Sequence, residues 1–264
     1  MTIIFFGDIV GKIGREAIKK VLPELNKKFK PDLIMANVEN LAHGKGVTEK
    51  TLDEMVEAGI NIFTSGNHIT KKGEFGKILS DEKYQLVRPA NYPPTVVGRE
   101  YLKLKIKNKN VFILNFLGRV FFRETVDCPF RKFDEIYNLL KIKKNDIVLI
   151  DFHAEATSEK RAFGWYVDGR ASALFGTHTH IETADEKILP LGTGYITDVG
   201  MTGGLETVIG VKKDNIIEGF LSQTTVLHEF PETGPVEVNA LLIKIDDQSG
   251  KCWELKRIHK EIKI

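Results

Sequence analysis

The sequence predicts an α/β protein with two stacked mixed β-sheets flanked by helices. In the first 65 residues, short apolar runs alternate with amphipathic stretches, a pattern typical of right-handed crossovers and a parallel sheet. Later in the chain, paired apolar runs at 95–117 and 236–263 indicate antiparallel hairpins. No internal repeat or Pro/Ser-rich linker interrupts the 264 residues, so we expect residues 1–264 to form a single domain.

Three β-branched and aromatic runs in the first part of the chain predict buried strands: residues 2–6, 32–38 and 60–65. Residues 15–29 carry an apolar stripe at helical spacing, and Pro23 inside it is expected to kink or split the helix. A second helix is expected to begin after the cap residue Thr48 and to end at Gly59.

The rest of the chain continues with strands and helices. Two strands are expected within 95–117, joined by a turn at Lys107–Asn110, and a helix is marked by an apolar stripe from Phe133 to Leu140. Two buried strands at 146–152 and 172–176 should enclose a helix around 158–168. The final hairpin is expected to turn at the sequence DDQSGK.

The composition excludes several classes of protein. The net charge is +2, which makes no case for nucleic acid or a membrane surface as the partner. Cys128 and Cys252 lie far apart in the sequence, so neither a zinc ribbon nor a disulfide scaffold is expected. No apolar run approaches the length of about 18 residues that a membrane span needs. We therefore expect a soluble cytoplasmic protein.

The motif GDIVGKIG at residues 7–14 resembles a phosphate-binding loop but does not meet its requirements. A P-loop needs four residues between its glycines and a hydroxyl residue after the lysine, whereas only three separate Gly7 from Gly11, and Ile13 follows Lys12. Asp8 would also repel a phosphate held by bare amides. Its carboxylate is compatible either with a helix cap or with a bound cation.

Polar residues follow five of the predicted strands, at the edge where ligands bind in open α/β sheets. These residues are Asp8, Glu39, Asn40, Asn67, His68, His153, His178 and His180. Each has an ordinary structural explanation on its own, such as a turn or a surface position. Because five strand ends share the feature, we predict a metal site.

The ligand types indicate the metal chemistry. Carboxylate, amide oxygen and imidazole without thiolate suit Mn²⁺, Fe or Zn²⁺, with Mg²⁺ as a further option, and disfavour structural zinc. The residues are too many for one ion, so we expect two ions about 3.5–4 Å apart, an arrangement typical of phosphoester hydrolysis.

With these residues assembled, the chain resembles the calcineurin-like metallophosphoesterase superfamily, whose fold is an α/β/β/α sandwich. The matching motifs are Asp8, Glu39, GNH at 66–68, His153 and GTHTH at 176–180. Two departures are Val10, where the superfamily usually has histidine, and Glu39-Asn40, where it usually has Gly-Asp. With GDIVGKIGR, NVEN and GTGYITDVGMTGG, this variant is similar to the YmdB-type bacterial subfamily.

The resemblance implies roles for these residues. Asp8, Glu39, Asn40 and His180 would surround one metal ion, with Asn40 in place of the missing histidine. Glu39, Asn67, His153 and His178 would surround the other, with Glu39 bridging. The more oxygen-rich first site favours Fe or Mn²⁺, with Mg²⁺ or Zn²⁺ as alternatives. His68 would protonate the leaving oxygen as a general acid.

The resemblance also implies a function, namely hydrolysis of 2′,3′-cyclic nucleotides or RNA ends by a metal-bridging hydroxide, in a homo-oligomer. Two alternatives stay open. One is a phosphomonoesterase or protein phosphatase, for which Arg15 or Arg119 could supply the extra positive charge. The other is a metal- or nucleotide-binding regulatory protein without turnover. The loop at 192–204 is either a turn-rich connection or a wall of the substrate pocket that brings Tyr195 or Asp198 near the site.

Overall fold

The computed structural model describes residues 1–264. The helices are α1 (Gly11–Phe29), α2 (Glu49–Ala58), the 3₁₀ helix η1 (Asn67–Lys71), α3 (Phe75–Ser80), α4 (Pro129–Leu139), α5 (Thr157–Val167) and α6 (Lys213–Ser222). The longer strands are β1 (Thr2–Ile9), β2 (Leu33–Asn37), β4 (Tyr101–Ile106), β5 (Lys109–Leu117), β6 (Ile147–His153), β7 (Ala173–Thr177), β13 (Pro235–Ile245) and β14 (Cys252–Lys263). The shorter strands are β3 (Ile62–Thr64), β8 (Lys187–Ile188), β9 (Gly194–Ile196), β10 (Met201–Gly204), β11 (Thr207–Val208) and β12 (Val211–Lys212). None of the helices combines the length and the apolar character needed to cross a membrane.

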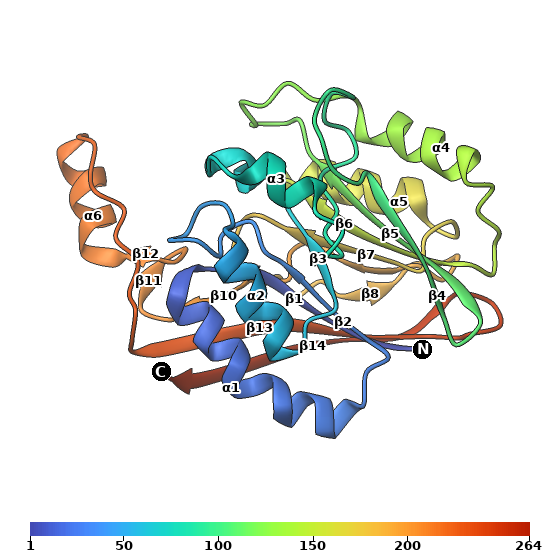
Figure 1. Ribbon diagram of the computed structural model, residues 1–264, viewed down its shortest axis with the longest axis horizontal. Coiled ribbons are helices and arrows are strands. Elements are labelled where there is room, and N and C mark those ends of the chain that lie inside the picture. Colours follow the sequence, from blue (N-terminus) through green and yellow to red (C-terminus); the bar gives the residue numbers. More distant parts are fainter.

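Two six-stranded mixed sheets stack face to face, as predicted (Figure 1). The first has the order β14-β13-β10-β1-β2-β3, and the second has the order β4-β5-β6-β7-β9-β8. β1, β2 and β3 are parallel, and so are β5, β6 and β7. Their carboxyl ends therefore lie along one edge of each sheet.

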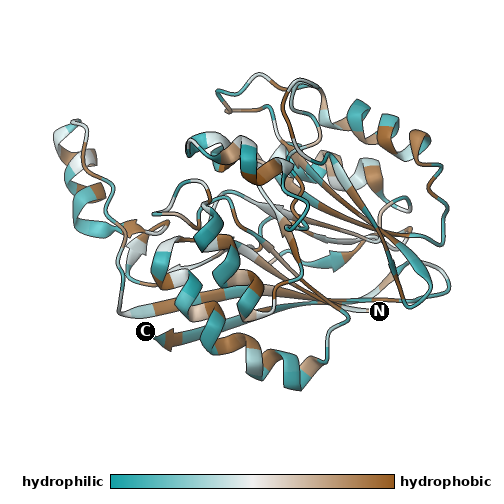
Figure 2. Ribbon diagram, in the orientation of Figure 1, coloured by the Kyte–Doolittle hydropathy of each residue, from teal (hydrophilic) through white to brown (hydrophobic).

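Three apolar cores separate the four layers. One lies between the first sheet and the helices α1, α2 and α3, and another lies between the second sheet and α4 and α5. The third lies between the sheets, where the rings of Phe5 and Phe175 approach to 4.0 Å between centroids. The central strands are accordingly mostly hydrophobic (Figure 2). This arrangement is the predicted helix–sheet–sheet–helix sandwich.

The first helix differs from its prediction at two points. It begins at Gly11 rather than at residue 15, because the Gly11 amide donates to the Asn40 carbonyl and the Gly14 amide closes the first turn. The expectation that Pro23 splits the helix is wrong. Pro23 lies on the exposed side, where water can bond the carbonyl that the proline leaves without a donor.

The glycine-rich segment 192–204 contains two strands that belong to different sheets. β9 pairs with β7 in the second sheet, whereas β10 pairs with β1 in the first. The connection at 197–200 therefore crosses from one sheet to the other beside the strands that carry Asp8 and Thr177. It passes so close that a methyl group on Gly7 would collide with the Gly200 carbonyl, and one on Gly176 with the Thr197 carbonyl.

This crossing predicts that Gly7→Ala and Gly176→Ala each lower the free energy of unfolding by about 1–3 kcal/mol, because the backbone must shift to admit the methyl group. Gly73→Ala is the matched control, since nothing lies within 4 Å of a methyl group there. Urea denaturation of the three variants measures the difference. Equal midpoints for Gly7→Ala and Gly73→Ala would show that the crossing is loosely packed.

Candidate metal centre

The polar residues predicted at the strand ends lie together where the two sheets meet. Asp8 in β1 is paired in register with Asn37 in β2, so the residues that follow β2 lie next to Asp8. In the second sheet, His153 is paired with Thr177, which places His178 beside His153. The parallel strands thus bring residues distant in sequence to one edge.

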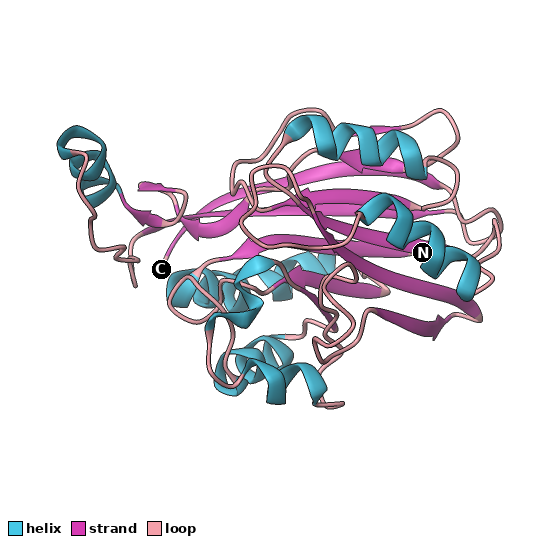
Figure 3. Cartoon of the chain, turned by 90° about the horizontal axis from the view of Figure 1, so that it is seen from above, coloured by secondary structure: helices cyan, strands magenta, loops and turns pink.

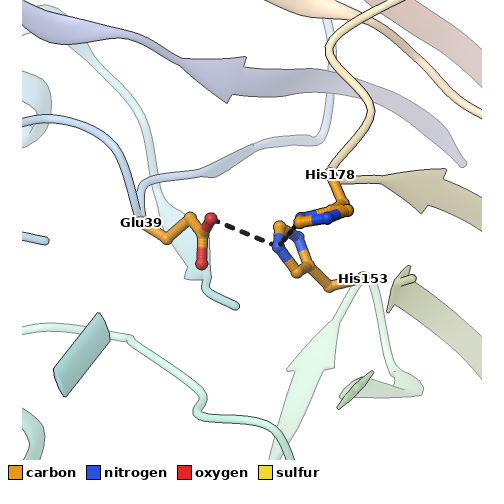
Figure 4. A group of neighbouring side chains, drawn as sticks. All are labelled: Glu39, His153 and His178. Carbon is orange, nitrogen blue, oxygen red and sulfur yellow. Dashed lines mark hydrogen bonds and ion pairs between the residues drawn. The ribbon is translucent and has the colours of Figure 1, made fainter. Parts of the chain in front are cut away.

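One cluster forms around Glu39. The Oε1 atom of Glu39 lies 3.2 Å from Nε2 of His153, and Nδ1 of His178 lies 3.1 Å from the same Nε2 (Figure 4). Oδ1 of Asn67 lies 3.2 Å from it as well. The ligand atoms of Glu39, His153 and His178 all lie within 4.8 Å of one another, close enough to bind one ion.

A second cluster forms around Asp8. Its Oδ1 atom lies 3.3 Å from Nδ2 of Asn40 and 3.8 Å from Nε2 of His180. The same Asn40 nitrogen lies 3.1 Å from the His180 ring. The oxygen and nitrogen of an amide are interchangeable by rotation, so Asn40 can turn an oxygen toward a cation here. This second cluster therefore brings together Asp8, Asn40 and His180.

His68 lies between the clusters. Its backbone amide donates to Oε2 of Glu39 over 2.7 Å. Its ring nitrogen Nδ1 lies 2.8 Å from Oδ1 of Asn40 and 3.2 Å from Oε1 of Glu39. The ring is therefore held through Nδ1, which leaves Nε2 available to a substrate.

The imidazoles of His153, His178 and His180 share one arrangement. In each ring, one nitrogen binds a partner outside the clusters, and the other nitrogen faces the clusters. Nδ1 of His153 bonds the Thr177 hydroxyl over 2.9 Å, and Nε2 of His178 pairs with the Glu155 carboxylate over 3.0 Å. Nδ1 of His180 bonds the Ile209 carbonyl over 2.9 Å. Outer partners of this kind fix the tautomer and orientation of metal-binding histidines.

The sequence analysis missed these outer partners. It also missed the buried network beneath them, which is centred on Asp151. The carboxylate of Asp151 accepts from Nδ2 of Asn37 over 2.9 Å, from Oγ1 of Thr177 over 2.6 Å, and from the Thr64 hydroxyl. All four residues are buried. Their signal in the sequence is a polar residue inside an otherwise apolar strand.

The charges of the site fit a cation. Burial by itself would lower the pKa of His153, but the Glu39 carboxylate raises it to about 9, so the cluster attracts positive charge. Burial by itself would raise the pKa of Glu39, but His153 and His68 hold it well below its usual value. Burial and then His153 lower the pKa of His178 to about 2, which leaves this ring neutral with a free lone pair. Ionised carboxylate and neutral imidazole are the forms that bind divalent metals, so a bound ion would replace the proton that His153 otherwise holds.

The residues of the 192–204 segment support the centre from outside. Asp198 is buried and pairs with the buried Nζ of Lys160 over 2.6 Å. It also accepts from the Thr179 amide over 3.1 Å, so it holds the loop between His178 and His180. Tyr195 is buried and bonds Thr197 over 2.9 Å.

Known proteins resemble this chain over nearly its whole length. Residues 4–258 match the model of the family described as YmdB-like protein. A 2′,3′-cyclic-nucleotide 2′-phosphodiesterase of Bacillus subtilis is 44% identical, covering 98% of this chain and 96% of that protein. Crystal structures of a hypothetical protein from Thermus thermophilus and a novel phosphatase from Mycoplasma pneumoniae are each 34% identical. They superimpose with TM-scores of 0.91 and 0.92, covering 99% of this chain and 99% and 93% of theirs.

The outer partner of His153 yields a test. Thr177→Val preserves shape but removes the hydroxyl between His153 and Asp151. We expect Mn²⁺ binding about 10–100-fold weaker and unfolding easier by about 1–3 kcal/mol. Calorimetric titration with Mn²⁺ measures the affinity, and Thr224→Val at an exposed position is the control. Unchanged affinity in Thr177→Val would contradict a role for this hydroxyl in orienting the ring.

Proposed function

The chain belongs to the YmdB-like family, and we propose that it is a dinuclear metal-dependent phosphodiesterase that acts on 2′,3′-cyclic nucleotides. The Bacillus subtilis relative carries this activity in its name, and 44% identity over nearly the full length supports the transfer. The proposal treats residues 1–264 as one catalytic domain that works in a homo-oligomer.

One observation carries the proposal. His153, His178 and His180 each bind an outer partner through one ring nitrogen and turn the other nitrogen toward the candidate ligands of the two clusters. Histidines with only a structural role have no need of this shared orientation. Three such rings with Asp8, Glu39, Asn40 and Asn67 provide nitrogen and oxygen ligands for two divalent ions, with Fe or Mn²⁺ as our assignment. Bound metal ions would supply a hydroxide nucleophile and offset the charge of the phosphate.

We assign His68 as the general acid. Glu39 holds its Nδ1 whichever way the Asn40 amide is turned, so Nε2 is the atom that carries the proton for the departing oxygen. Glu39 would hold both ions, since its Oε1 atom is 3.2 Å from Nε2 of His153 in one cluster and its chain neighbour Asn40 belongs to the other. Its Oε2 atom meanwhile accepts from the His68 amide and so ties the acid to the metal ligands.

The phosphomonoesterase alternative requires additional cations to bind the dianion. Arg15 does not meet this need, because its guanidinium bonds Glu54 over 2.9 Å and the Leu41 carbonyl. Parallel assays of bis-p-nitrophenyl phosphate and the corresponding monoester distinguish the two reactions. A purely regulatory metal- or nucleotide-binding protein would turn over neither substrate.

The activity itself is tested with 2′,3′-cyclic AMP. We expect hydrolysis to disappear when the protein is stripped of metal with a chelator and to return when Mn²⁺ is added back. If elemental analysis confirms bound metal and no hydrolysis occurs, cyclic nucleotides are not the substrate.

Substitutions at the two central residues separate metal binding from proton transfer. His68→Ala should keep its metal and lower kcat by about 10²–10⁴-fold, the usual contribution of a general acid. Glu39→Ala should lose both ions, because it removes the shared ligand. Elemental analysis and steady-state kinetics of both variants provide the measurement. Loss of metal from His68→Ala would refute the assignment of this residue.

A further inference from the structure

A recess of about 350 Å³ adjoins the metal centre. Asn40, His68 and His180 line one side of it. The opposite side is formed by apolar residues, chiefly Ile209 and Phe220, together with Phe230. Its volume lies within the range of roughly 300–1,000 Å³ found for small-molecule sites, which are mostly apolar with a few polar groups.

The apolar wall belongs to a segment that projects from the sandwich. It consists of the β11–β12 hairpin and α6, and Figures 1 and 3 both place α6 away from the sheets. No residue of α6 is buried, and the Phe220 side chain is 81% exposed. An aromatic ring left in water at the rim of a recess is available to stack on a ligand.

The hairpin is tied to the metal centre through Ile209. The Ile209 carbonyl accepts from Nδ1 of His180 over 2.9 Å. Ile209 has a φ of 47°, which is strained for a β-branched residue and is typical of functional sites. The contact fixes the distance between the apolar wall and the His180 ring.

A second recess of about 300 Å³ lies on the other side of His68 and differs in chemistry. It is lined by Lys45, Lys71, Arg123 and Glu124, together with the exposed ring of Phe121. Charged walls favour phosphate or water over an apolar ring. His68 and Lys45 line both recesses, so a substrate whose phosphate lies beside His68 can extend into either.

We propose that the recess between His180 and α6 binds the nucleobase of the substrate, with Phe220 as the ring on which the base stacks. This inference rests on the proposed function. The phosphate of a 2′,3′-cyclic nucleotide belongs at the metal ligands, and its ribose then directs the base outward. Of the two recesses beside His68, this one offers apolar walls for a planar ring. Stacking on an aromatic side chain accepts any base, so the site selects nucleotides over base-free diesters.

The test compares 2′,3′-cyclic AMP with 1-O-methylribose 2′,3′-cyclic phosphate, which lacks the base. In Phe220→Ala, we expect kcat/KM for cyclic AMP to fall about tenfold or more, mainly through KM, because base stacking is lost. The factor by which kcat/KM falls for the base-free diester should be at least about tenfold smaller than the factor for cyclic AMP. Phe220→Tyr should restore the preference for cyclic AMP over the base-free diester. Leu221→Ala is the matched control, because Leu221 is also 81% exposed but does not line the recess.

Two outcomes would overturn the inference. An equal loss for both substrates in Phe220→Ala would mean that the ring acts on the metal centre rather than on a base. A selective loss in Phe121→Ala instead of Phe220→Ala would place the base in the charged recess.

Failure of the proposed function gives a separate result. If the parent protein hydrolyses neither diester, binding of adenosine 3′-monophosphate to the Mn²⁺-loaded protein is measured by calorimetry. Binding that Phe220→Ala weakens and Leu221→Ala does not would support the base site without the activity. The absence of binding would refute both the base site and the proposed function.

Discussion

The carboxylate of Asp151 joins the two sheets at the edge that carries the candidate metal ligands. It accepts from Asn37 and Thr64 of the first sheet and from Thr177 of the second. Burial raises the pKa of Asp151 to about 6, although His153 and the hydrogen bonds from Thr177 and Thr64 act to lower it. Because Thr177 also bonds His153, the orientation of a candidate metal ligand follows from the way the sheets are joined. A buried carboxylate left without these donors would destabilise both the interface and the site.

The sequence predicted the fold well wherever local patterns decide it. Apolar runs located the longer strands of both sheets but not the short strands β8, β9 and β10, and Thr48 and Gly59 cap α2 as expected. The errors occurred where distant contacts override local preference. α1 begins at Gly11 despite the low helix propensity of glycine, because the amide of Gly11 bonds a carbonyl 29 residues away along the chain, that of Asn40. The exchange of sheets within 192–204 depends on pairing partners, which a single sequence does not reveal.

The candidate site could be predicted to a similar extent. The candidate ligand residues follow strands, and that position in the sequence is the reason they were predicted. Their supporting groups were not recognisable in the same way. The Ile209 carbonyl that bonds His180 belongs to the backbone, and nothing in the identity of that residue signals it. Glu155 lies on a loop and reads as an ordinary surface acid, although it pairs with His178. Such groups are found only when the geometry is known.

The pairing of β1 with β13 has a consequence for the order in which this protein can fold. β1 carries Asp8 and is made within the first nine residues, but its antiparallel partner β13 starts at Pro235. While the ribosome is still adding the middle of the chain, β1 has an open edge and Asp8 lacks its final surroundings. Pairing across so long a stretch of chain is slow, because the loop must close before the contacts form. The surroundings of Asp8 are therefore completed late, because His180 follows β7 and β13 is made near the end of the chain.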